Sequence, residues 1–152
     1  LEGEVVAVVA DGVVIFNGDP EDPNAESYRV GGGAIALATA ESHVHIGLRY
    51  IGELETLDLD VQGSDVRDKR KRIAALSLLL ERSSRKFYVG PDETHLRQVR
   101  TQAFEPTDDA FTGQVSLNLT SHFNEYGRVL IRQYDPLPLT VLGILPSIEL
   151  GA

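Results

Sequence analysis

The sequence predicts an all-β protein, a sandwich or barrel with at most one or two short helices. Three observations predict it. Asp11-Gly12 joins two segments rich in β-branched residues, which is a strong signal for a hairpin. Residues 114–120 alternate between polar and apolar side chains, as a strand buried on one face does. Glycine and proline separate the remaining apolar segments, as at Gly31-Gly32-Gly33.

The first half of the chain begins with the hairpin, whose strands we expect at residues 4–10 and 13–16. Residues 17–27 are acidic and hold two prolines, so they cannot pair inside a sheet and are expected to form a mobile loop. Strand structure is predicted to resume at residues 28–30 and, after the three glycines, at 34–39.

In the second half, residues 44–57 are predicted to be one long extended segment, bent at Gly47 and Gly52. The alanines and leucines of residues 72–82 favour a helix by propensity. We nevertheless predict a strand there, because the neighbouring segments are strands and cations crowd what would be a helix N-terminus. Further strands are predicted at 86–89, 96–103, 114–120, 128–134 and 139–150.

Composition excludes several classes of function. The 152 residues suit one domain and include 14 Lys and Arg against 23 Asp and Glu, a net charge of -9 that opposes binding to nucleic acid or anionic lipid. The absence of cysteine excludes disulfides, thiolate metal sites and a cysteine nucleophile. No apolar run is long enough to span a membrane. Methionine is absent even at position 1, which predicts that the chain is an excerpt of a longer polypeptide.

Few residues could carry chemistry. His43 and His45 would share a strand face, a spacing that metal sites use, but no third ligand is fixed near them. Asp92, Glu93 and His95 could form an acid–base cluster, although a turn explains them more simply. No GxSxG motif accompanies Ser42 or Ser121, and the glycine triplet lacks the spacing of a phosphate-binding loop. We therefore expect no catalytic residue, metal or cofactor.

The charge layout is more informative, because an acidic stretch is followed at once by a basic one. These residues could simply be solvated, or they could meet head to tail between identical subunits. Glu53 and Glu55 would share one strand face, and in a ring they could form an acidic wall that lets DNA pass without sticking. The candidate interface or channel-wall residues are Glu53, Glu55, Asp58, Asp60, Arg67, Lys69, Arg70, Lys71 and Arg72.

Ordered segments resemble one known family. The chain contains VHIGLRY at 44–50 running into ELETL at 53–57, then KRI at 71–73, FTG at 111–113, GRVLIRQ at 127–133 and PLPLTVLGILPSIEL at 136–150. In this order they resemble the tail tubular protein B, or nozzle, proteins of short-tailed bacteriophages, over about residues 43 to 150. The chain departs from that pattern at Asp58, at Gln114 and in the leucine-rich 72–82 segment.

The resemblance implies a structural protein of the virion tail, made in the cytoplasm of the bacterial host, and no enzyme. Such proteins form a hexameric ring below the portal and adaptor that extends the channel through which DNA leaves. The resemblance places this excerpt in the platform region, which is related to tail-tube folds and lies C-terminal to a β-propeller. Its partners would be further copies, the adaptor and tail fibre proteins, with DNA passing but not bound specifically.

Two other classes of function stay open. A carbohydrate-binding or host-attachment β domain of a phage tail would need a groove lined by exposed aromatic side chains, for which the chain has five Tyr, five Phe and no Trp. A depolymerase would need paired carboxylates on a concave face, and Glu53 with Asp58 or Asp60 is what the sequence provides.

Overall fold

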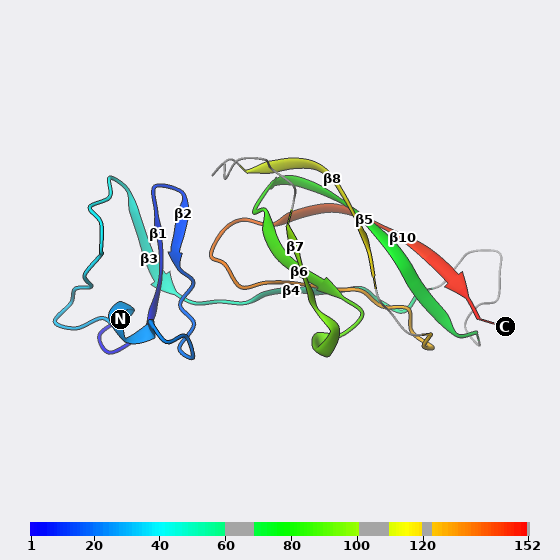
Figure 1. The fold of residues 1–152 in the computed structure, drawn as a ribbon, viewed down its shortest axis with the longest axis horizontal. Helices are drawn as coiled ribbons and strands as arrows, with labels where there is room; N and C mark the ends of the chain where they lie inside the picture. Colours follow the sequence, from blue (N-terminus) through cyan, green and yellow to red (C-terminus); the bar gives the residue numbers. More distant parts are fainter. Residues whose placement is uncertain (60–68, 101–109, 120–122, 152) are drawn as a thin grey trace. The chain divides into compact units, whose positions relative to one another are not determined.

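A computed structural model describes residues 1–59, 69–100, 110–119 and 123–151. These residues form ten strands in three antiparallel sheets and two short 3-10 helices, so the all-β prediction is confirmed (Figure 1). The length of the sequence predicts one domain, whereas the fold divides into two compact units. Unit 1 comprises Leu1–Ile51 with Tyr134–Leu137, and unit 2 comprises Gly52–Gln133 with Pro138–Ala152. Each unit has its own apolar core.

Unit 1 is built on a three-stranded sheet in the order β2-β1-β3. Its strands are β1 (Val6–Ala10), β2 (Val13–Phe16) and β3 (Val44–Leu48). The predicted hairpin is confirmed. Its turn residues Asp11 and Gly12 both have positive φ angles, 47° and 88°, as the tight turn that matches the twist of two strands requires.

The core of unit 1 is small. Val6 and Val8 of β1 are fully buried together with Val30, and partly buried side chains of Tyr28, Ile35 and Leu37 pack against them. The ring of Phe16 on β2 stacks on Tyr28 with centroids 4.4 Å apart. Segments outside the sheet therefore cover the face that carries Val6 and Val8.

Unit 2 is a sandwich of two sheets that face each other across one core (Figure 1). One sheet has the order β10-β5-β8 and the other β4-β9-β6-β7. The strands are β4 (Gly52–Glu55), β5 (Lys71–Ser83), β6 (Lys86–Gly90), β7 (Arg97–Arg100), β8 (Phe111–Asn118), β9 (Leu130–Gln133) and β10 (Thr140–Leu150).

The strand predicted at 72–82 is confirmed as β5, the central strand of its sheet. Leu76, Leu78 and Leu80 alternate along it and are each at most 1% exposed, so they form the middle of the core. From the opposite sheet, Phe87 and Ile131 complete the same cluster. The leucines that favour a helix by propensity thus serve a sheet here, because both neighbouring strands supply backbone partners.

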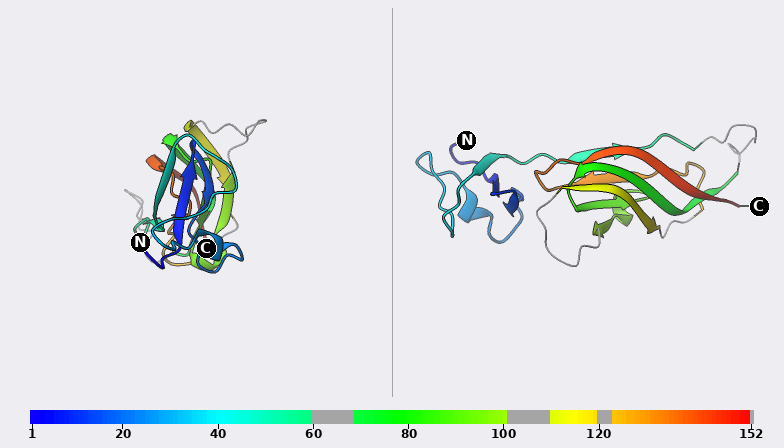
Figure 2. Two further views of the ribbon diagram at one scale, coloured as in Figure 1. Left: turned by 90° about the vertical axis from the view of Figure 1, so that its left-hand side faces the viewer. Right: turned by 90° about the horizontal axis from the view of Figure 1, so that it is seen from above.

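Other predicted strands are largely confirmed. β8 shows the expected alternation over residues 114–118 of the predicted strand 114–120, and residue 120 lies outside the described residues. β6, β9 and β10 lie within or close to the predicted segments. β7 covers the first part of 96–103, and the rest of that segment lies outside the described residues. Figure 2 shows β5 (green) and β10 (red) running side by side, and they pair from Lys71 to Glu81 of β5.

Three predictions of extended structure need correction. Residues 34–39 form no strand and have only an isolated bridge between Gly31 and Ala34, because Ile35 and Leu37 pack onto the core from a loop. The segment 44–57 is divided into β3 and β4, which belong to different sheets. At 28–30, Tyr28 ends the 3-10 helix Ala25–Tyr28, and Arg29 forms a single bridge with Val5.

The acidic loop at 17–27 is organised by short-range hydrogen bonds. The backbone N–H of Asp19 donates to the Asn17 side chain, and that of Asn24 donates to Asp22. Asp19 also pairs with Arg49 at 2.9 Å, and Ala25 is buried. The mobility expected for this loop stays a prediction.

Candidate functional site

The acidic residues of β4 are paired with arginines of β9 in the same chain. Glu53 and Arg132 are direct cross-strand partners, and the Nε of Arg132 donates to Glu53 at 2.6 Å. The Nη2 of the same guanidinium lies against Glu53 as well and donates to Glu93 at 2.6 Å. The Arg132 side chain is only 15% exposed, whereas the two glutamates that it joins are exposed to solvent.

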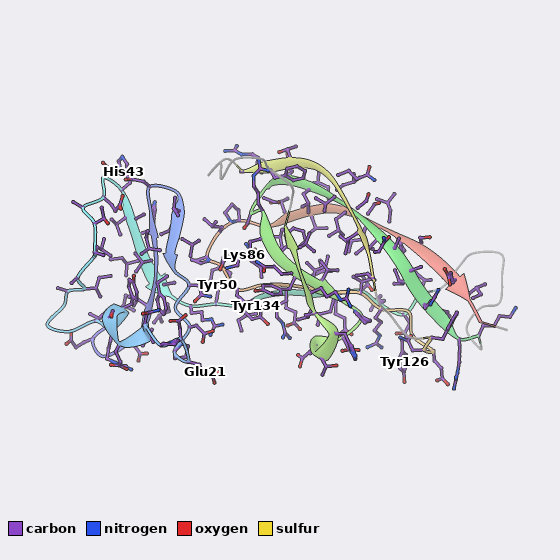
Figure 3. The ribbon with its side chains drawn as sticks, in the orientation of Figure 1. Glu21, His43, Tyr50, Lys86, Tyr126 and Tyr134 are labelled. Carbon is purple, nitrogen blue, oxygen red and sulfur yellow. The ribbon has the colours of Figure 1, made fainter. Side chains whose placement is uncertain are left out.

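A second arginine repeats the arrangement next to it. Arg128 donates to Asp58 at 2.5 Å and to Glu55 at 3.4 Å, and its guanidinium lies 5.1 Å from the centroid of the Tyr126 ring. Figure 3 labels Tyr126 on this part of unit 2. The hydrogen bond to Asp58 raises the pKa of Arg128. Glu53 and Glu55 do share a strand face, but the arginines offset their charge.

The basic residues that follow the acidic stretch differ from one another in exposure. Lys69 and Arg70 are exposed, as a solvated or subunit-binding run would require. Lys71 is 1% exposed, and its Nζ donates to the carbonyl oxygens of Leu59 and Glu125, both at 3.1 Å. Arg72 pairs with Glu149 on β10 and lies over the ring of Phe123.

These placements limit the interface expected from the sequence. Asp60 and Arg67 lie outside the described residues. Lys71 presents no charge to the surface because carbonyl groups enclose its ammonium. The pairing of the acidic strand was not predicted, because Arg128 and Arg132 lie 73 and 79 positions away from Glu55 and Glu53 in the sequence. One signal in the sequence could have predicted this pairing: the acidic segment ELETL and the segment GRVLIRQ, which has two arginines, carry opposite charges.

The histidines occupy separate surroundings. His43 lies beside the β1–β2 turn (Figure 3), where its backbone N–H donates to the carboxylate of Asp11 at 2.9 Å. His45 is exposed on β3 and pairs across the strands with Val9. Within the described ranges, no group of three or more His, Asp or Glu side chains could hold a metal ion.

The cluster at 92–95 forms a cap. Asp92 accepts hydrogen bonds from the backbone N–H groups of Thr94 and His95 at the start of the 3-10 helix Glu93–His95. Its carboxylate also accepts from the Thr94 hydroxyl and lies 2.7 Å from the Nδ1 of His95. These bonds, with the Thr94 hydroxyl first, lower the pKa of Asp92. An exposed carboxylate with a lowered pKa is a poor general base and a good helix cap.

The outward face of sheet β10-β5-β8 has few charges. Its β8 side chains alternate with the core residues Val115 and Leu117 and are all polar and uncharged. They are Thr112, Gln114, Ser116 and Asn118. Three leucines interrupt the polar surface: Leu79, Leu142 and Leu145 are 38%, 63% and 52% exposed. We call these seven residues the outer sheet face.

The pairing register of the strands places residues of this face next to one another. Leu79 is the cross-strand partner of Gly143, where a Cβ would come within 3.4 Å of the leucine side chain. The hydroxyls of Ser77 and Ser116 meet at 2.8 Å between β5 and β8. Leu145 is the partner of Ser77 across β10 and β5. The face is therefore continuous over all three strands.

No protein-family model matches the chain, and no curated protein sequence matches it. Within the part of the chain that the structure describes, no helix has the length and apolar character needed to cross a membrane.

Proposed function

We propose that this chain is a structural component of a bacteriophage tail that forms a hexameric ring and extends the DNA-ejection channel below the portal and adaptor. The outer sheet face is the observation that carries this proposal. It combines three exposed leucines with a row of uncharged polar side chains, and exposed apolar side chains with few charges around them support a contact between subunits.

The charge of unit 2 supports a contact between identical copies. Its sequence holds 14 acidic and 12 basic side chains, a net charge of -2, so two copies of this unit repel each other weakly. The ordered resemblance to nozzle proteins also falls mainly on unit 2, from β4 through β10. DNA would pass the ring without being held, since the whole chain carries a net charge of -9.

Assembly provides the test. The chain is purified, and its mass is measured by sedimentation velocity alone and in the presence of a portal–adaptor complex, with electron micrographs taken of the same samples. We expect six-fold rings in the class averages. Replacing Leu142 and Leu145 by lysine should disperse them, because charged side chains would be buried in the contact. Val13→Lys, which changes an exposed apolar side chain of unit 1, should leave the rings intact.

A chain that stays monomeric both alone and with the portal–adaptor complex would overturn the proposal. Binding of the monomer to a glycan array would then favour the host-attachment alternative. Polysaccharide cleavage lost in Glu53→Gln would favour the depolymerase.

A further inference from the structure

The sheet edges of this protein are protected to different degrees. Exposed edge strands normally carry charges or proline, because their free backbone groups otherwise pair with other chains. β4 carries two glutamates, β7 two arginines, and β10 contains Pro146. β2 has only four residues, and the outward side chains of β8 are polar.

β3 has none of these protections. It pairs with β1 on one side and with no described strand on the other. Its five residues, Val44-His45-Ile46-Gly47-Leu48, include no proline, Asp, Glu, Lys or Arg. An added strand could pair with its free backbone groups by the same ladder that joins β3 to β1.

The side chains of β3 make that edge apolar on one face. Val44, Ile46 and Leu48 are the cross-strand partners of Ala10, Val8 and Val6, so they lie on the face that carries the core of unit 1. The core partners are at most 2% exposed, but Val44, Ile46 and Leu48 are 37%, 47% and 56% exposed. The core thus continues to the edge of the sheet and is left uncovered there.

The charge of unit 1 indicates which kind of partner could cover the edge of β3. The sequence of unit 1 contains nine acidic side chains and two basic ones, a net charge of -7. Both basic residues are already paired, Arg29 with Glu26 and Arg49 with Asp19. Asp11 lies at the N-terminal end of β3, where it accepts hydrogen bonds from the N–H groups of Ser42 and His43, and Glu41 precedes them in the chain.

We propose that the edge of β3 binds an extended, basic segment of a different protein, which adds a fourth strand to the sheet of unit 1. Alternate apolar side chains of that segment cover Val44, Ile46 and Leu48, and its Lys or Arg residues lie near the carboxylates of unit 1. A second copy of this chain is a poor occupant, because it would bring a net charge of -7 against the same charge. The proposal holds whether or not unit 2 forms rings.

The probe is a synthetic peptide of about nine residues, the length of one strand, with valine and threonine alternating and two lysines at each end. Its affinity for the full chain is measured by fluorescence anisotropy, and its site by amide chemical shifts of residues 44–48. We expect binding that weakens when the salt concentration is raised to about 1 M, where charges are screened within about 3 Å. The same peptide with glutamates at its ends should bind at least about tenfold more weakly.

Two variants separate the edge from the rest of the sheet. Ile46→Lys places a charge on the free edge and should weaken binding by about tenfold or more. Ile15→Lys adds the same charge to the opposite edge strand, where Ile15 is 41% exposed, and should change affinity by less than about twofold. Circular dichroism establishes that both variants fold. The doubly substituted Leu142 and Leu145 variant should bind the peptide normally even if it cannot form rings.

Several results would overturn the proposal. One is the absence of peptide binding, and another is equal affinity for the lysine and glutamate peptides. A third is unchanged affinity in Ile46→Lys. Sedimentation that reveals a dimer dispersed by Ile46→Lys would instead make a second copy the occupant.

Discussion

The two units differ in how much of their apolar surface they bury by themselves. In unit 2, ten buried side chains between the two sheets and beside them form one cluster, whereas unit 1 has a cluster of three. Unit 2 is also close to electrically neutral, while unit 1 carries most of the negative charge of the chain. Unit 2 therefore buries most of its apolar side chains within its own core. Unit 1 leaves Val44, Ile46 and Leu48 exposed at the edge of its sheet.

The largest expected effect is on the core of unit 2. Leu78 on β5 is 0% exposed, and Leu78→Ala should lower the free energy of unfolding by about 3 kcal/mol, because it leaves a cavity between the two sheets. Val8→Ala in unit 1 should cost about 1.5 kcal/mol, from the loss of two methyl groups. Urea unfolding followed by circular dichroism measures both, with Leu142→Ala as an exposed control. Equal losses at Leu78 and Val8 would contradict the contrast between the units.

The next largest effect is expected at Gly90, where two segments of the backbone of unit 2 lie close together. Gly90 ends β6 beside the 3-10 helix capped by Asp92, and a Cβ there would lie 2.4 Å from the carbonyl oxygen of His95. Gly90→Ala should therefore shift the backbone and cost about 2 kcal/mol. At Gly31 a Cβ meets nothing within 4 Å, so Gly31→Ala serves as the control in unit 1. Thermal unfolding measures both variants, and equal melting temperatures for Gly90→Ala and Gly31→Ala would contradict this explanation.

The buried lysine tests whether the basic run acts through its charge or its hydrogen bonds. Lys71→Met keeps the apolar stem but leaves the carbonyls of Leu59 and Glu125 without their donor, so it should cost about 1–2 kcal/mol. Lys69→Met removes the same charge from an exposed position and should change stability by less than about 0.5 kcal/mol. Urea titrations of both proteins make the comparison. A Lys69 variant as unstable as the Lys71 variant would assign the effect to net charge.

The smallest effect concerns pH and unit 1. Hydrogen bonds from the N–H groups of Ser42 and His43 lower the pKa of Asp11 below its ordinary value of 3.8. Its carboxylate therefore stabilises the folded chain above that value, and this contribution is lost as the pH falls through the lowered pKa. Asp11→Asn should flatten the fall in stability below about pH 4. Unfolding measured from pH 2 to 7 tests this, and a variant with the same slope as the original chain would contradict it.

Local patterns predict a strand well where residues close in the sequence determine its structure and at least one neighbouring strand pairs with it. The Asp11-Gly12 turn and the alternation in β8 depend on neighbouring residues, and both are confirmed. Residues 34–39 have a strand-like composition but no pairing strand, and a single sequence contains no information on that absence. The charged candidates show the same limit. Glu53 and Arg132 meet because β4 and β9 pair in that register. Lys71 can be buried because the carbonyl groups of Leu59 and Glu125 accept hydrogen bonds from its ammonium group.

The pairing of β5 with β10 has a consequence for the end of the chain. The ladder runs from Thr140 opposite Glu81 to Leu150 opposite Lys71, and it finishes where the Gly151 N–H donates to Arg70. Backbone hydrogen bonds at strand ends open more easily than those in the middle of a strand. Here the Arg72–Glu149 ion pair stabilises the last pairs between β5 and β10. Amide protons near residue 149 should consequently exchange with solvent more slowly than is usual at the end of a strand. A segment joined after residue 151 would then begin next to a stable part of the sheet.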